Sequence, residues 1–154
     1  MQTPPDVAFR QAEPPDLALL VGMMRAYYTL DAIPFDEARA TRAMQGLIAS
    51  PAHGEAYVIE HAGTPVGYLG ITLGYSLEFG GVDAFLDELF VAEAWRGRGI
   101  GTAALSFAEQ ACRARGVVAV HLEVERHNPR ARALYERFGF EPHDRYLMSR
   151  WLAR

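Results

Sequence analysis

The chain has 154 residues, a formal net charge of −4 and an apolar fraction of 50%. This length suits one domain that buries about two-thirds of the surface of its unfolded chain, and the composition excludes disordered and collagen-like chains. The weak negative charge excludes the usual electrostatic signature of nucleic-acid binding, and a lone cysteine excludes an intrachain disulfide and a cysteine-based zinc site.

The N-terminal region predicts a protein without a targeting segment. The opening residues, MQTPPDVAF, lack the charged region and apolar stretch of a signal peptide. The longest apolar run, residues 17–24, is broken by Gly22 and stops at Arg25, which is too short to span a bilayer. We therefore expect one domain over residues 1–154 that resides in the cytoplasm and binds neither membranes nor nucleic acid.

The first third of the chain predicts one strand followed by two helices. Residues 7–11 are typical of a short strand. Asp16 is placed to cap a helix in which apolar residues recur at intervals of three and four. Asp36 is placed in the same way to cap a second helix.

The middle of the chain predicts three antiparallel strands. The segments EAYVIEH, VGYLGITLGY and VDAFLDELFV have the composition of strands and are joined by links of hairpin length that contain glycine. Because such short links connect antiparallel neighbours, the three segments predict a meander.

Next, the chain predicts a helix and a parallel strand. Residues 100–115 have the apolar periodicity of a helix, and Gly116 is placed to end it. Residues 117–125 are typical of a buried strand. The helical crossover should make this strand parallel to the one that ends at Val91.

A helix and a last strand are predicted near the C-terminus. Asn128 stands at the N-cap position of the helix, Pro129 at its first position, and Gly139 after its end. A last strand is expected around Tyr146 and Met148. The summed order predicts an α/β fold with a mixed, mostly antiparallel sheet.

The segment WRGRGIGTA predicts an anion-binding loop. Backbone N–H groups at a helix N-terminus lack intrahelical partners and carry the positive end of the helix dipole. Gly97, Gly99 and Gly101 remove side chains that would keep the backbone away from a phosphate, and Arg96 and Arg98 supply charge-assisted donors. An ordinary surface loop is the alternative that this composition leaves open.

The residues also bear on two other types of phosphate-binding loop. The chain contains no lysine, which excludes a Walker A loop. A dinucleotide-binding loop, and with it an NAD(P)-dependent oxidoreductase, stays as an alternative because Glu123 lies where a ribose-binding acid is expected. Against it, Thr102 stands in place of a third close glycine, and the chain after Glu123 is too short for the rest of a doubly wound sheet.

The pattern Arg96-x-x-Gly99-x-Gly101, after an apolar strand ending in Phe90-Val91, resembles the acyl-CoA pyrophosphate loop of the GNAT superfamily of N-acyltransferases. Downstream, LEVERHNPRARALYERFGF is similar to that family's later block of an Asn, a helix, a Tyr and a Gly-Phe. The resemblance implies a sheet with helices on both faces and a splayed parallel strand pair. It also implies an N-acetyltransferase that uses acetyl-CoA as co-substrate and no metal.

The same resemblance implies which residues bind coenzyme A. The splayed strand ends would offer backbone groups to pantetheine, and an amide near Val91 would stabilise the oxyanion. The residues implied for cofactor binding are Leu89, Phe90, Val91, Arg96, Gly97, Arg98, Gly99, Ile100, Gly101, Thr102, Asn128, Ala131 and Tyr135.

Direct transfer needs a base and an acid. An alkylamine titrates near pH ~10, so most acceptor arrives protonated and must lose a proton. Asp87, Glu88 and Glu123 lie on the two strands expected to flank the cleft, and the choice among them stays open. The resemblance implies that Tyr135 protonates the departing thiolate.

The acceptor stays open between a small molecule and the amine of a peptide or protein, and a homodimer is also left open. Net acidity favours a cationic amine. A non-catalytic acyl-CoA-binding or sensing module is the alternative function. The five histidines lack metal-ligand spacing, and Cys112 is expected to be a small core residue.

Overall fold

The computed structural model describes residues 4–153, which form two compact units that divide after Glu123. The first unit holds a sheet and three α-helices, and the second holds one α-helix and the C-terminal segment. No helix in the described part of the chain is both long and apolar enough to cross a bilayer. The single domain expected over residues 1–154 stays a prediction.

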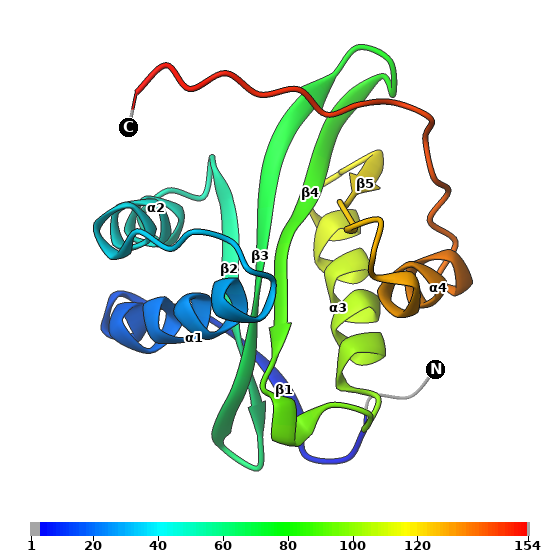
Figure 1. Cartoon of the computed structure of the whole chain (residues 1–154). Helices are drawn as coiled ribbons and strands as arrows, with labels where there is room; N and C mark the ends of the chain where they lie inside the picture. Colours follow the sequence, from blue (N-terminus) through cyan, green and yellow to red (C-terminus); the bar gives the residue numbers. More distant parts are fainter. Residues whose placement is uncertain (1–3, 154) are drawn as a thin grey trace. The chain divides into compact units, whose positions relative to one another are not determined.

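The sheet of the first unit has five strands in the order β1-β2-β3-β4-β5 (Figure 1). The strands are β1 (Val7–Gln11), β2 (Gly54–His61), β3 (Thr64–Ser76), β4 (Gly81–Val91) and β5 (Ala119–His121). The strands β1 to β4 pair antiparallel, and β4 pairs with β5 in parallel. The predicted meander, parallel pair and mixed sheet are therefore confirmed.

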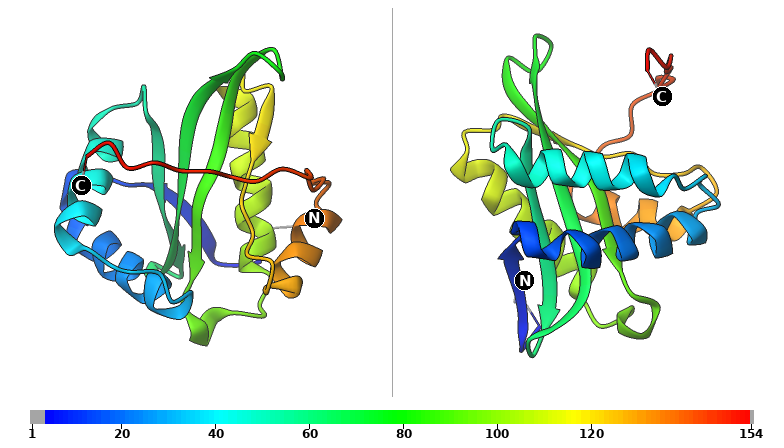
Figure 2. Two further views of the ribbon diagram at one scale, coloured as in Figure 1. Left: turned by 45° about the horizontal axis from the view of Figure 1, so that its top comes forward. Right: turned by 90° about the vertical axis from the view of Figure 1, so that its left-hand side faces the viewer.

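Helices cover both faces of this sheet. The helices α1 (Leu17–Leu30) and α2 (Glu37–Ala49) lie side by side on one face, and α3 (Ile100–Ala114) lies on the other (Figures 1 and 2). Short 3-10 turns, η1 (Pro14–Asp16) and η2 (Glu93–Trp95), precede α1 and follow β4. This arrangement confirms the layered α/β fold.

Each face of the sheet has its own core. On the α1/α2 face, Leu20 and Met24 of α1 and Met44 of α2 pack in one cluster with Tyr68 and Phe90 of the sheet. Full burial of one such side chain stabilises the fold by about 1.5–3 kcal/mol.

The α3 face is built around an aromatic contact. The Phe107 ring of α3 stacks on Phe9 of β1 at 4.6 Å between centroids and meets the edge of Tyr57 of β2 at 4.8 Å. Cys112 is buried in the same helix, as expected from its apolar face. Burial raises the pKa of the Cys112 thiol.

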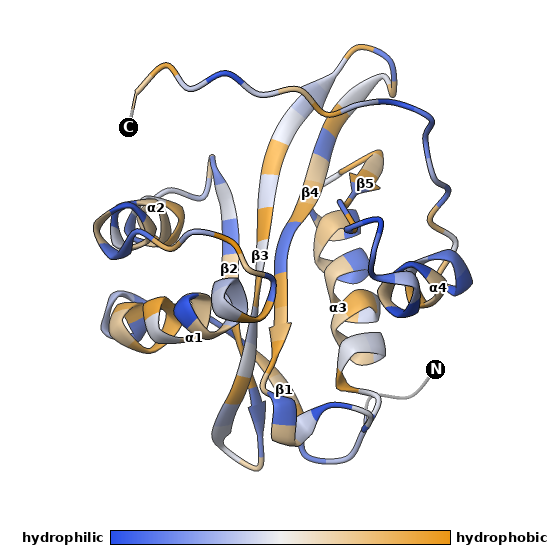
Figure 3. Cartoon of the chain, in the orientation of Figure 1, coloured by the Kyte–Doolittle hydropathy of each residue, from blue (hydrophilic) through white to orange (hydrophobic). Residues whose placement is uncertain are grey.

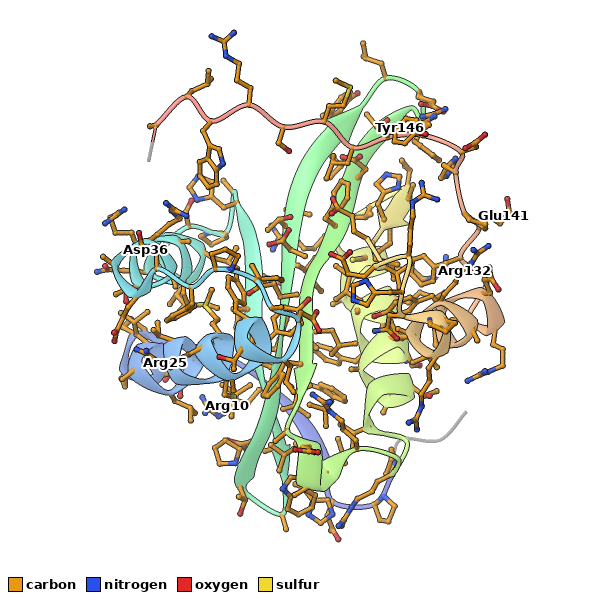
Figure 4. All side chains as sticks on the ribbon, in the orientation of Figure 1. Arg10, Arg25, Asp36, Arg132, Glu141 and Tyr146 are labelled. Atoms are coloured by element: carbon orange, nitrogen blue, oxygen red, sulfur yellow. The ribbon has the colours of Figure 1, made fainter. Side chains whose placement is uncertain are left out.

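The helix cap predicted at Asp36 is confirmed. The Asp36 side chain, labelled in Figure 4 at the start of α2, accepts a hydrogen bond from the Arg39 backbone N–H at 2.9 Å. Asp16 stands at the N-cap position of α1 as predicted, but its side chain forms no capping hydrogen bond to that helix. Its carboxylate instead accepts from the backbone N–H of Glu13 and from Arg10, because the chain enters α1 through the turn η1.

The predicted strand over residues 117–125 is too long. Only Ala119–His121 pairs with β4, the last pair joins Phe85 to His121, and none of the three residues of β5 is fully buried. A strand at the sheet edge keeps its geometry only where a neighbour accepts its hydrogen bonds. Since β4 continues to Val91, the two strands pair at one end only, as the splayed pair requires.

The second unit contains α4 (Pro129–Arg137). Its predicted cap is confirmed, since the Asn128 side chain accepts a hydrogen bond from the Ala131 backbone N–H at 3.1 Å. Gly139, at a φ of +90°, ends the helix as predicted. The predicted last strand is wrong: within the described residues 141–153 no strand forms, and Tyr146 and Met148 are exposed. Strand-forming side chains alone cannot hold an extended segment that lacks a ladder partner.

Candidate active site

The glycine loop before α3 has a backbone that only glycine adopts without strain. Gly97 has a φ of +71° and Gly99, the N-cap of α3, has a φ of +79°. A side chain at either position would be strained whatever the space around it. The predicted glycine requirement therefore has a conformational cause as well as the expected lack of bulk.

The loop presents the N-terminus of a long, anchored helix. The first bond of the α3 ladder runs from the Ala103 N–H to the Gly99 carbonyl at 3.0 Å. The N–H groups of Ile100, Gly101 and Thr102 precede that bond, so they lie at the positive end of a 15-residue helix. Ile100 is buried and fixes the start of the helix.

Arg96 contacts residues that precede the loop, and Arg98 contacts the first residue of the loop itself. The Arg96 Nε donates to the Val91 carbonyl at 2.8 Å, and its guanidinium lies 5.8 Å from the centre of the Phe90 ring. The Arg98 guanidinium lies 4.8 Å from the centre of the Trp95 ring. The Arg96 contacts tie the loop to the end of β4.

Beyond Phe85, the edge of β4 that faces β5 has no ladder partner among the residues described in the first unit. The opposite edge pairs with β3 up to Val91. Leu89 and Val91 therefore direct backbone groups to an edge that the sheet does not use, whereas the alternate residue Phe90 faces β3, and the Val91 carbonyl accepts from Arg96. This is the strand end at which pantetheine contacts were expected.

A β-bulge in β4 brings two carboxylates to one side of the sheet. Gly70 pairs with Glu88 and the next residue, Ile71, pairs with Leu86, so Asp87 is the extra residue of β4. In a regular strand, adjacent side chains point to opposite faces. Because the bulge shifts the alternation, Asp87 and Glu88 line the same cavity. Figure 3 shows this hydrophilic stretch midway along β4, ahead of its apolar C-terminal end.

The cavity has a volume of about 370 Å³ and lies between α2 and the sheet, with one residue from α1. Its floor is made by alternate residues of β3, Tyr68, Gly70 and Thr72, which share one face of the strand. Its complete lining is Met24, Arg42, Ala43, Met44, Gly46, Leu47, His53, Tyr68, Gly70, Thr72, Asp87 and Glu88. A volume of this size suits a small-molecule group.

Glu88 is held in a setting that disfavours its charge. Burial raises the pKa of Glu88, and the neighbouring charge of Asp87 raises it further. Interactions with the hydroxyls of Tyr28 and Tyr68 oppose that rise in pKa, and the Tyr68 hydroxyl donates to Glu88 Oε1 at 3.1 Å. Desolvation also raises the pKa of Asp87, which keeps contact with solvent. Raised carboxyl pKa values are typical of general bases.

The third predicted carboxylate lies elsewhere. Glu123 follows the end of β5 by two residues, is exposed, and does not line the cavity. The structure therefore groups Asp87 with Glu88 and leaves Glu123 apart from them.

The remaining predicted residues belong to the second unit. Asn128 and Ala131 form the cap of α4, and Tyr135 stands one turn further along that helix. The Tyr135 ring is half-buried and meets the Phe140 ring edge-on at 6.1 Å between centroids. The Phe140 backbone N–H donates to the Tyr135 carbonyl at 3.0 Å, so the chain folds back at Gly139.

Sequence reasoning missed two features of the cavity. The Tyr68 hydroxyl that binds Glu88 belongs to a residue twenty positions earlier, and Arg42 reaches the cavity from a helix that shows only a core stripe in the sequence. It also missed the pair between His121 Nε2 and Asp83 Oδ2, 3.1 Å apart across β4 and β5. Strand register places Tyr68 beside Glu88 and His121 beside Asp83, and this register is a tertiary property.

Comparison with known proteins agrees with this geometry. The model of the acetyltransferase (GNAT) family matches residues 21–140. The uncharacterized N-acetyltransferase YycN of Bacillus subtilis is 39% identical over 70 residues, which are 46% of this chain and 44% of that protein. The matched region thus spans less than half the length of that relative.

Solved structures share the whole fold. An integron cassette protein from the mobile metagenome of Cole Harbour Salt Marsh is 35% identical, with a TM-score of 0.83, and the match covers 97% of this chain and 92% of that one. The aminoglycoside N-acetyltransferase AAC(6')-Iy in complex with CoA has a TM-score of 0.80 at 15% identity, covering 96% of this chain and 95% of that one. The second likeness is one of fold alone.

Proposed function

Because the chain belongs to the acetyltransferase (GNAT) family, we propose that it transfers the acetyl group of acetyl-CoA to the primary amine of a small molecule. The observation that carries this proposal is the course of β4. This strand bears Asp87 and Glu88 in a cavity and then leads into the glycine loop before α3. Glu88 and Val91 are three residues apart, which is a rise of about 10 Å along the strand. One strand can therefore place Glu88 near the acceptor amine and the backbone at Val91 near the acetyl group.

The glycine loop is proposed to hold the pyrophosphate of acetyl-CoA. The first N–H groups of α3 supply donors and a positive dipole end, and Gly97 and Gly99 let the backbone approach. The pantetheine arm would then run along the unpaired edge of β4 at Leu89 to Val91. Asn128, Ala131 and Tyr135 join this set through the family resemblance.

Glu88 is the proposed general base. It takes a proton from the acceptor ammonium, and the neutral nitrogen attacks the thioester carbonyl carbon to form the C–N bond. Burial and the contact with Tyr68 support Glu88 over Asp87, and the exposed position of Glu123 supports it over that residue. Mutation of Asp87 or of Glu123 would test each of these residues as the alternative base.

The remaining steps of the transfer use a backbone N–H group and the phenol of Tyr135. A backbone N–H near Val91 stabilises the oxyanion, a role worth roughly 3–4 kcal/mol in comparable sites. The C–S bond then breaks while the nitrogen releases its second proton to solvent, and Tyr135 is proposed to donate its proton to the thiolate sulfur and to regain one from solvent. The phenol pKa of about 10 and the thiol pKa of about 8.5 are close enough for this transfer.

The cavity volume of about 370 Å³ supports a small molecule over a protein chain as acceptor. The aminoglycoside acetyltransferases among the solved structures share the fold with this chain, and a small-molecule acceptor is compatible with that fold. A cytoplasmic location is part of the same proposal, because the buried thiol of Cys112 suits a reducing compartment.

The test is thiol release from acetyl-CoA with a panel of amines, alongside calorimetric binding of acetyl-CoA. We expect turnover with small amines, and a loss of at least about 100-fold in kcat for Glu88→Gln with unchanged acetyl-CoA affinity. Binding without turnover on any amine would instead identify an acyl-CoA sensor. Binding of NAD(P) in place of acetyl-CoA would identify an oxidoreductase.

A further inference from the structure

The two walls of the cavity carry opposite charges. The sheet wall presents the carboxylates of Asp87 and Glu88, whereas α2 presents the guanidinium of Arg42. The chain as a whole is acidic, with a net charge of −4, so a basic wall at this point is not a consequence of overall composition.

Arg42 is exposed, and in the part of the chain that the structure describes its guanidinium forms no hydrogen bond and no ion pair. Asp36, six residues earlier, pairs with Arg39 instead, at 3.7 Å. The pKa of Asp36 is lowered chiefly by the Arg39 backbone N–H and only to a lesser degree by the charge of Arg42. The Arg42 guanidinium is thus available to a ligand in the cavity.

A polycation would meet repulsion at this wall. Its first amine would suit Asp87 and Glu88, but a second ammonium would lie against the Arg42 guanidinium. An anionic group at the same place would gain charge-assisted hydrogen bonds from the guanidinium, whose planar fork matches a carboxylate or a phosphate.

Resting on the proposed function, we propose that the acceptor is a small dipolar molecule, an amine that also carries a carboxylate or phosphate. Its ammonium faces Glu88, where it loses its proton, and its anionic group binds Arg42. The cavity of about 370 Å³ has room for one such small molecule. Arg42 is then a specificity residue that takes no part in bond making.

The space above Gly70 is open, so a ligand can extend from the carboxylate wall to Arg42. A Cβ added at Gly70 would meet only the Leu47 Cδ2, at 3.8 Å, so the space between the two charged walls is open. Apolar side chains of Met24, Met44 and Leu47 line the same space and suit a short methylene stem between the two charged ends.

The experiment compares matched amines at saturating acetyl-CoA. The probes are ω-amino carboxylates of three to five carbons, their amides, diamines of the same lengths, and O-phosphoethanolamine. The proteins are the full chain, Arg42→Gln, Arg42→Glu, and Arg113→Gln as a control on α3, where that arginine forms only an exposed pair with Glu109. Thermal unfolding checks that each variant folds.

We expect kcat/KM for an anionic amine to exceed that for its amide by about 10- to 100-fold, the effect of one charge-assisted contact. Arg42→Gln should remove this preference, Arg42→Glu should transfer it to the diamine, and Arg113→Gln should change nothing. The better of carboxylate and phosphate identifies the anion.

Two other outcomes separate the two proposals. Equal or better use of amides and diamines, unaffected by Arg42→Gln, would overturn the dipolar acceptor and leave acetyl transfer standing. Acetyl-CoA binding without turnover of any amine would overturn acetyl transfer, and the dipolar acceptor would fall with it.

Discussion

Removal of the Tyr68 hydroxyl should move the pH dependence of the reaction. In the folded protein this hydroxyl donates to Glu88 Oε1 at 3.1 Å and stabilises the charged carboxylate, which lowers the pKa of Glu88 against the opposing effect of burial. Tyr68→Phe removes that hydrogen bond and keeps the buried ring, so the pKa of Glu88 should rise further.

The size of the shift follows from the strength of the bond. A hydrogen bond to a charged group contributes about 1.5–3 kcal/mol, and about 1.36 kcal/mol corresponds to one pKa unit. Tyr28 still interacts with the same carboxylate and compensates for part of the loss. We therefore expect the acid limb of kcat/KM against pH to move up by about one unit.

The assay is acceptor kcat/KM at saturating acetyl-CoA across pH 5 to 9, in the wild type and Tyr68→Phe. Tyr57→Phe is the matched control, because the Tyr57 hydroxyl also donates to a glutamate, Glu55, but outside the cavity. An acid limb that stays in place in Tyr68→Phe, or that moves equally in the control, would refute the assignment of Glu88 as the base.

Three further substitutions address the other parts of the site. Gly99→Asp should raise the Kd of acetyl-CoA at least 10-fold in calorimetry, because φ is +79° there and the new charge would face phosphate; an unchanged Kd would argue against this loop. Tyr135→Phe should lower kcat by about 100-fold with acetyl-CoA binding nearly intact, and full activity would remove Tyr135 as the acid. Gly70→Val should raise the acceptor KM without changing acetyl-CoA binding, since it fills open space in the cavity; an unchanged KM would place the acceptor elsewhere.

The sequence could predict those features that depend only on residues close together in the chain. Asn128 and Asp36 cap their helices because a short polar side chain meets an N–H three residues on, whatever surrounds them. The glycine loop is likewise local, because left-handed backbone at Gly97 and Gly99 strains any residue with a side chain. Apolar periodicity was enough to order the strands and helices, and the fold class followed from that order.

Only the tertiary structure decided the rest, because each remaining feature depends on a partner far along the chain. The Asp16 carboxylate binds Arg10 and the backbone N–H of Glu13 instead of capping α1. The strand β5 is short because only Ala119–His121 pairs with β4. The bulge that points Asp87 and Glu88 into one cavity exists only in the register between β3 and β4, and no local pattern encodes it.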